Sequence, residues 1–167
     1  MTVNPRLLAI LWVSAIAING CGQFSNVTPP VLDLDSGLNT RASDRQPNFS
    51  HDGNYLVFSS DRSSSRNVYL YDVRQKKLLP LPGLNQAQSM QYDPAISADG
   101  KYLVYVSEQY GAPNIMFYDR AGKTVKNITQ DFVGEVRQPT ISGNGRFIAF
   151  ESNRTGQWDI QIYDRGL

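Results

Sequence analysis

Few residues in this chain could do chemistry, and they are widely separated. His51 is the sole histidine among 167 residues, and Cys21 is the sole cysteine. Two other segments of the chain resemble the surroundings of His51, with Ala98 and Gly143 at the matching positions. We therefore expect His51 to be an exposed turn residue. That leaves no base for a Ser-His-Asp triad and no histidine-rich zinc site.

The acidic residues do not suggest an active site either. Asp52 and Asp99 match Asn144 in the third segment, and a turn accepts either residue type whereas an acid-base role does not. Glycosidases need two carboxylates at a definite separation, and calcium loops need dense oxygen ligands. We expect no catalytic residue, no metal and no cofactor, and hence no enzyme. The isolated acidic residues are Asp61, Glu108, Asp131, Glu135 and Glu151.

Three segments of the chain align on one another without a gap, namely residues 47–72, 94–119 and 139–164. Each begins with proline and ends with Tyr-Asp, and two serines and a glycine stand at matching places between them. Their starts lie 47 and 45 residues apart, a period typical of propeller blades. Because such units cannot bury their apolar faces alone, we expect each to pack against the next.

Each unit is predicted to be a set of strands joined by tight turns. Asp-Gly or Asn-Gly between the first two strands predicts a two-residue hairpin turn with positive φ, and the aromatic and branched runs that follow predict buried central strands. The pattern predicts an all-β fold of three four-stranded propeller blades. The predicted strands are residues 48–50, 55–58, 68–71 and 78–81, then 95–97, 102–105, 115–118 and 125–128, then 140–142, 147–150 and 160–163. The predicted turn residues are Asp52, Gly53, Asp99, Gly100, Asn144 and Gly145.

The third unit has no segment for a fourth strand, whereas residues 31–34 resemble residues 78–81 and lie equally far before the next proline. We therefore expect the N-terminal strand to complete the last blade. Propellers have about 4 to 8 blades, so three blades are too few to close a ring. Two chains would supply six blades. The sequence predicts a homodimer in which each N-terminal strand completes the third blade of the partner.

The repeat resembles that of TolB, the periplasmic component of the Tol-Pal envelope system. The shared pattern is proline, an apolar residue and serine, then Asp-Gly, an aromatic residue, an apolar strand, serine and a strand ending Tyr-Asp, and it covers residues 31–167. TolB itself resembles a six-bladed propeller behind an α/β domain, for which this chain has no room. Similar blades occur in Tricorn-like and prolyl-oligopeptidase-like proteins. The resemblance implies a non-enzymatic envelope interaction module whose partners resemble peptidoglycan-associated lipoproteins.

The N-terminal residues predict export. Residues 1–20 contain one arginine and an apolar run from Leu7 to Ile18, which fits a signal peptide and is short for a membrane span. Residues 18–21 resemble a bacterial lipobox, which implies lipidation of Cys21; an ordinary secretory signal is the alternative. Residues 21–30 then form a short tether before the repeats at 31–167. We expect a lipoprotein anchored to a membrane in the bacterial periplasm.

The charges and the variable loops bear on partners. Outside residues 1–20, 15 basic residues face 15 acidic ones, which gives no support for nucleic-acid binding. Residues 61–66, 108–113 and 153–158 occupy equivalent places and differ, as loops do when they bind a partner or when nothing constrains them. Alternatives to a protein-interaction module are a glycan-binding or small-ligand-binding propeller and an accessory subunit of a separate hydrolase. The candidate partner-binding residues are Asp61, Arg62, Glu108, Tyr110, Arg154 and Trp158.

Overall fold

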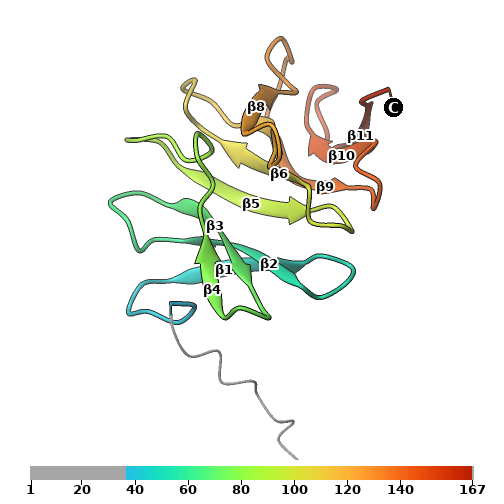
Figure 1. Cartoon of the computed structure of the whole chain (residues 1–167). Helices are drawn as coiled ribbons and strands as arrows, with labels where there is room; N and C mark the ends of the chain where they lie inside the picture. Colours follow the sequence, from blue (N-terminus) through green and yellow to red (C-terminus); the bar gives the residue numbers. More distant parts are fainter. Residues whose placement is uncertain (1–36, 167) are drawn as a thin grey trace, which may run out of the picture. The chain divides into compact units, whose positions relative to one another are not determined.

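The computed structural model describes residues 37–166, which form strands joined by turns and loops (Figure 1). The predicted signal peptide, Cys21, the tether and the predicted strand of residues 31–34 lie outside the described residues. Within residues 37–166, no helix has the length and hydropathy that a membrane crossing requires.

The strands form three antiparallel sheets, each ordered as in the sequence. The first sheet contains β1 (Asp44–Phe49), β2 (Tyr55–Ser60), β3 (Asn67–Asp72) and β4 (Lys77–Leu79). The second contains β5 (Gln91–Ile96), β6 (Tyr102–Ser107), β7 (Asn114–Asp119) and β8 (Thr124–Asn127). The third contains β9 (Val136–Ile141), β10 (Phe147–Ser152) and β11 (Asp159–Asp164). The prediction of an all-β fold built from three blade-like sheets is confirmed, and among the described residues the third sheet has three strands.

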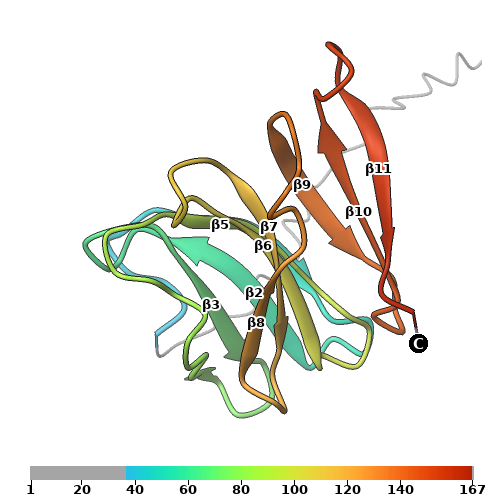
Figure 2. The same ribbon diagram turned by 90° about the horizontal axis from the view of Figure 1, so that it is seen from above.

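Two hydrophobic cores join the sheets, with the second sheet between the other two (Figure 2). Successive residues of β6 point to opposite faces, so Leu103 enters the first core and Val104 the second. Both side chains have no exposed surface. The first core contains Val57, Val68, Leu70, Leu84, Ile96, Leu103, Tyr105, Met116 and Tyr118. The second core contains Ala95, Val104, Val106, Ile115, Phe117, Val136, Ile148 and Phe150.

The first strand of every sheet bulges at the residue before its proline. Gln46, Asp93 and Gln138 have φ angles of 55°, 49° and 49°, and the strand register shifts at each of these points. The side chain of Gln46 donates a hydrogen bond to Asp93, and the amide of Asp93 donates one back to Gln46 Oε1 at 3.1 Å. The bulges thus link the first two sheets through polar contacts, beside the cores that link them through apolar ones.

Each Asp-Gly or Asn-Gly pair lies in a four-residue loop, which corrects the predicted two-residue turn. In the first sheet the amide of Ser50 donates to the carbonyl of Tyr55 at 2.9 Å, which leaves residues 51–54 as the loop. The Ser50 hydroxyl donates to Asp52 at 2.6 Å and lowers the pKa of that carboxyl. Equivalent contacts occur in the other two sheets. The glycines Gly53, Gly100 and Gly145 have φ angles of 67°, 71° and 76°.

Candidate functional site

The loops that join the second and third strands of each sheet lie at the end of the strands opposite the glycine turns. This follows from the register, since Ser60 pairs with Asn67 beside the loop of residues 61–66, whereas Tyr55 pairs with Asp72 at the glycine end. The loops of residues 108–113 and 153–158 occupy the same end of their sheets. The loop end therefore gathers the candidate partner-binding residues that the sequence predicted.

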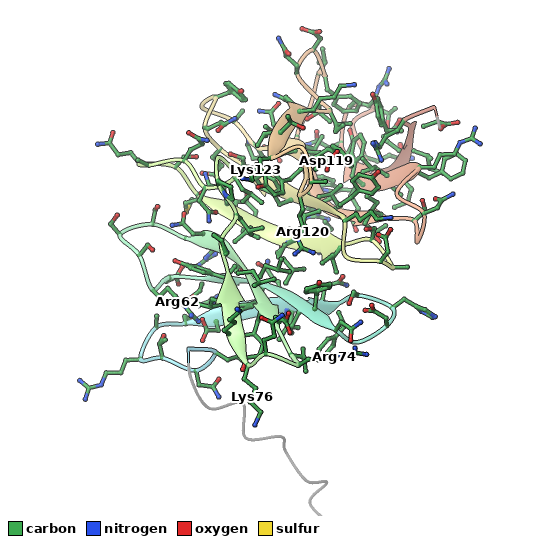
Figure 3. All side chains as sticks on the ribbon, viewed as in Figure 1. Arg62, Arg74, Lys76, Asp119, Arg120 and Lys123 are labelled. Carbon is green, nitrogen blue, oxygen red and sulfur yellow. The ribbon has the colours of Figure 1, made fainter. Side chains whose placement is uncertain are left out.

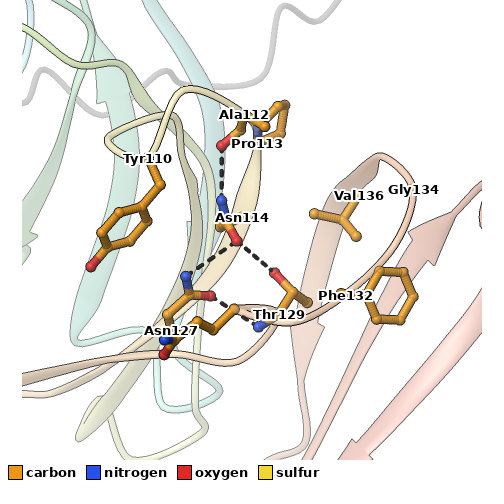
Figure 4. Close-up of a pocket in the computed structure, with 10 residues that line it drawn as sticks. Tyr110, Ala112, Pro113, Asn114, Asn127, Thr129, Phe132, Gly134 and Val136 are labelled. Atoms are coloured by element: carbon orange, nitrogen blue, oxygen red, sulfur yellow. Dashed lines mark hydrogen bonds between the residues drawn. The ribbon is translucent and has the colours of Figure 1, made fainter.

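A cavity of about 410 Å³ opens at the loop end between β7, β8 and the segment that leads into β9 (Figure 4). Its floor is a group of polar side chains held by hydrogen bonds. Asn114 Nδ2 donates to the carbonyl of Ala112 at 2.9 Å, and Asn127 Nδ2 donates to Asn114 Oδ1 at 3.2 Å. The Thr129 hydroxyl accepts the amide of Ile115 at 2.9 Å, so a side chain continues the pairing of β7 after β8 ends. The lining is therefore preorganised.

Tyr110 stands between this cavity and a second one of about 660 Å³, because its side chain lines both. The second cavity lies against residues 86–89 and also contacts Asn127. Tyr110 is 64% exposed, and Figure 4 shows it on the other side of Asn114 from Phe132. An exposed aromatic ring beside two recesses has the geometry of an anchor for a partner.

Arg62 has a different environment from Tyr110, although the sequence placed both among the partner-binding candidates. Its guanidinium donates to the carbonyls of Gly37 and Leu38 at 2.5 and 2.8 Å and to Asp44 at 2.8 Å. It also lies 5.0 Å from the ring centroid of Phe58. With only 12% of its side chain exposed, Arg62 fixes residues 37 and 38 against the first sheet.

Two other predicted residues are paired within their own sheets. Asp61 forms an ion pair with Arg66 at 2.8 Å. Glu108 accepts a hydrogen bond from the Tyr92 hydroxyl at 2.9 Å, and burial together with this bond raises the pKa of Tyr92. The structure therefore brings Glu108 next to Tyr110 but commits its carboxylate to an internal contact.

The remaining two candidates lie on the third sheet. The guanidinium of Arg137 stacks 3.7 Å from the ring centroid of Trp158 and forms an ion pair with Glu151 at 2.7 Å. Arg154 lies 5.3 Å from the ring centroid of Phe132, one of the residues that line the first cavity. Arg154 is thus near the Tyr110 surface, whereas Trp158 stacks on a side chain of β9.

Sequence reasoning missed the polar floor of the cavity. Asn114 opens the third strand of its unit, as Asn67 does in the first unit, so a repeated asparagine was visible. Thr129 lies beyond the aligned segments and carried no such signal. Among residues 37–166, no group of three or more histidine, cysteine or acidic side chains is placed to hold a metal ion.

Comparisons with known proteins agree with this architecture. A family model for the TolB beta propeller domain matches residues 33–165. No curated protein matches the sequence significantly.

Several solved structures share the fold. TolB from Acinetobacter baumannii is 25% identical with a TM-score of 0.57, and the match covers 73% of this chain and 30% of that one. A protein assigned as TolB from Agrobacterium tumefaciens is 24% identical with a TM-score of 0.63, covering 78% of this chain and 45% of that one. The propeller domain of the Trilobed protease from Pyrococcus furiosus, described as having an open velcro topology, is 15% identical with a TM-score of 0.53, covering 74% and 39%. The chain thus spans less than half the length of these structures.

Proposed function

Because the chain belongs to the TolB beta propeller domain family, we propose that it is a non-enzymatic protein-interaction module of the bacterial periplasm, anchored to a membrane through lipid on Cys21. The observation that carries the proposal is the Tyr110 surface, which consists of Tyr110 and the two cavities on either side of it. Its partners would be envelope proteins, including ones that resemble peptidoglycan-associated lipoproteins. This partner class comes from the likeness to TolB.

The chemistry of the Tyr110 surface favours a protein segment as its ligand. Tyrosine offers a large apolar ring and a hydroxyl at low cost in side-chain entropy, which is why it is enriched at binding hot spots. The Tyr110 ring is exposed, and the amides of Asn114 and Asn127 surround the adjacent recess. An apolar side chain of a partner could enter the recess while the partner backbone bonds to polar groups at its rim.

We expect a photocrosslinking amino acid at position 110 to capture an envelope partner from intact cells, whereas the same probe at exposed Lys123, in the turn between β7 and β8 at the opposite end of the strands, captures none. Tyr110→Ala should weaken co-purification of that partner by about 30-fold, since loss of an aromatic hot spot costs about 2 kcal/mol. Identical capture at both positions, or undiminished binding by Tyr110→Ala, would count against the Tyr110 surface.

A glycan is the second candidate ligand, because an aromatic ring beside two asparagine amides also suits the faces and hydroxyls of a sugar. Saturable binding on a glycan array that Tyr110→Ala abolishes would favour this ligand class. Protein capture that excess glycan does not compete would favour the protein class.

Membrane anchoring has its own test. We expect the mature protein to begin at Cys21 with lipid mass attached, and Cys21→Ser to leave it unprocessed or in the soluble fraction. Acyl chains contribute about 0.8 kcal/mol for each buried methylene, so several chains on one cysteine hold a protein at a membrane. Intact mass spectrometry of the membrane fraction decides the question, and a mature form without lipid would refute the anchor.

A further inference from the structure

The junction between the first and second sheets contains an arrangement of three residues, which we call the aromatic clasp. Tyr55, the first residue of β2, lies beneath the guanidinium of Arg120, whose carbon is 4.5 Å from the ring centroid. Arg120 also donates a hydrogen bond to the carbonyl of Gly100, in the glycine turn of the second sheet. A Cβ atom on Gly100 would come within 2.4 Å of the Tyr55 ring. The ring of one sheet is thus held between a glycine and an arginine of the next.

The same clasp recurs between the second and third sheets. Tyr102 lies beneath Arg165 at 4.6 Å, and Arg165 donates to the carbonyl of Gly145 at 2.7 Å. A Cβ atom on Gly145 would come within 2.3 Å of the Tyr102 ring. Two junctions of the same design show that the clasp is a general device for joining consecutive sheets of this protein.

The third sheet carries the aromatic half of another clasp, which no other sheet covers among the described residues; the Phe147 ring contacts Arg146 of its own sheet, whose guanidinium carbon lies 4.8 Å from the ring centroid. Phe147 matches Tyr55 and Tyr102 in the alignment and is 42% exposed. On the same face, Ile160 and Ile162 of β11 are 65% and 70% exposed. Their counterparts in the first sheet, Val68 and Leu70, are buried in the first core, and Ile115 and Phe117 are buried in the second. The centre of this face therefore has the composition of a junction, and its edge carries Glu151, which is paired with Arg137 and stands where the second sheet has Val106.

The first sheet carries the complementary half. Gly53 is exposed, and no described residue lies within 4 Å of the position where its Cβ would be, whereas Gly100 and Gly145 are buried. Phe49 is 56% exposed although its counterpart Ile96 is buried in the first core. Val73 stands where the clasp has arginine, so an apolar residue would meet Phe147, which lacks the hydroxyl of tyrosine.

The nearest arginine in the first sheet is Arg74, one residue after Val73 in the sequence. Unlike the clasp arginines, it lies over no aromatic ring among the described residues. Figure 3 shows Arg120 at the junction of the first two sheets and Arg74 on the side of the first sheet away from the second. Among residues 37–166, no other sheet covers the complementary half, where Phe49 is exposed and Val73 packs beside Leu56, Phe58 and Tyr71.

We propose that the exposed face of the third sheet docks on the first sheet of a second copy of this chain, with Phe147 of one copy between Gly53 and Val73 of the other. Both halves of the junction belong to one chain and lie at the positions that form the two junctions inside it, with Val73 in place of the clasp arginine. Two copies form the contact twice under two-fold symmetry and leave neither half open, giving six sheets, within the range of about 4 to 8 blades that close a propeller. This surface is separate from Tyr110 and stands independently of the proposed function.

The test uses full-length protein purified in detergent as an equal mixture of ¹⁴N and ¹⁵N chains, with a photocrosslinking amino acid at position 147. We expect mixed-isotope crosslinks to peptides that contain Phe49, Gly53 or Val73, and a mass in light scattering near twice that of one chain. Crosslinks within one isotope only, or to another part of the partner, would overturn the proposal, as would a monomer at high micromolar concentration.

A pair of variants separates docking from folding. Ile162→Asp places a charge at the centre of the docking face, and we expect it to raise the dimer dissociation constant by about 30-fold or more, as loss of a central apolar anchor does. Val133→Asp is the matched control, since Val133 is 82% exposed and lies outside that face; it should leave the dimer intact. Both variants should retain the circular dichroism of the parent. Equal dissociation constants for the two folded variants would overturn the proposal.

Discussion

Gly100→Ala is expected to lower the free energy of unfolding by about 2–5 kcal/mol, although it adds a single methyl group at a turn. A left-handed φ costs an L-residue about 1–2 kcal/mol, and Gly100 has φ of 71°. The added Cβ also meets the Tyr55 ring at 2.4 Å, and overpacking of this kind costs about 1–3 kcal/mol. Urea denaturation of the variant and the parent measures the difference.

Gly53→Ala is the matched control, because Gly53 has φ of 67° and no described neighbour at the Cβ position. It should cost only the backbone strain of about 1–2 kcal/mol. Both variants should be made in the Ile162→Asp background, so that association between copies does not contribute. If the two alanines destabilise equally, the contact with Tyr55 contributes nothing and the clasp has no energetic role.

The strands were largely predictable because their signals are local and occur three times. The aromatic and branched run at residues 55–58 lies inside β2, and residues 68–71 lie inside β3. The fourth strand of the first sheet was predicted less accurately. Residues 78–81 were expected, whereas β4 covers Lys77–Leu79. This strand is short because Asn85 takes over the pairing, donating to the carbonyl of Val68 and accepting from its amide. Because a polar side chain takes the place of the strand backbone here, the sequence has no hydrophobic pattern that would mark where the strand ends.

The glycine turns were predicted in kind and missed in detail. Asp-Gly correctly indicated a turn with positive φ, but the loop has four residues because the amide of Ser50 pairs with the carbonyl of Tyr55. The Ser50 hydroxyl also accepts the amide of Tyr55 at 3.0 Å, which stabilises the wider loop. The repeated serine was visible in the alignment, yet its contacts depend on a strand five residues away.

The site was harder to predict because its contacts join units of the chain. Arg62 and Tyr110 both stood in variable loops, and nothing local distinguished them. Arg62 turns toward the carbonyls of Gly37 and Leu38, which precede the aligned segments, whereas Tyr110 is exposed. The clasp was not predicted for the same reason. The regular spacing of Tyr55, Tyr102 and Phe147 does not indicate which sheet their rings contact.

Leu103→Ala is expected to destabilise all three sheets together, with a loss of about 2–5 kcal/mol, which is the usual cost of truncating a fully buried leucine. Leu103 has no exposed surface and packs in the first core, on the sheet that takes part in both junctions. In an array of units stabilised by their neighbours, damage to the middle unit removes support from both ends. Urea unfolding followed by far-ultraviolet circular dichroism should show one transition at a lower midpoint.

Ile148→Ala is the informative comparison, because Ile148 is equally buried but belongs to the terminal sheet and packs only in the second core. We expect it to loosen the third sheet before the other two. Trp158 reports on that sheet through its stack on Arg137, and it is the sole tryptophan once residues 1–20 have been removed. Its fluorescence should change at a lower urea concentration than the circular dichroism in Ile148→Ala and together with it in Leu103→Ala. Coincident transitions in both variants would show that the three sheets fold as one cooperative unit and that the junctions are stronger than the sheets they join.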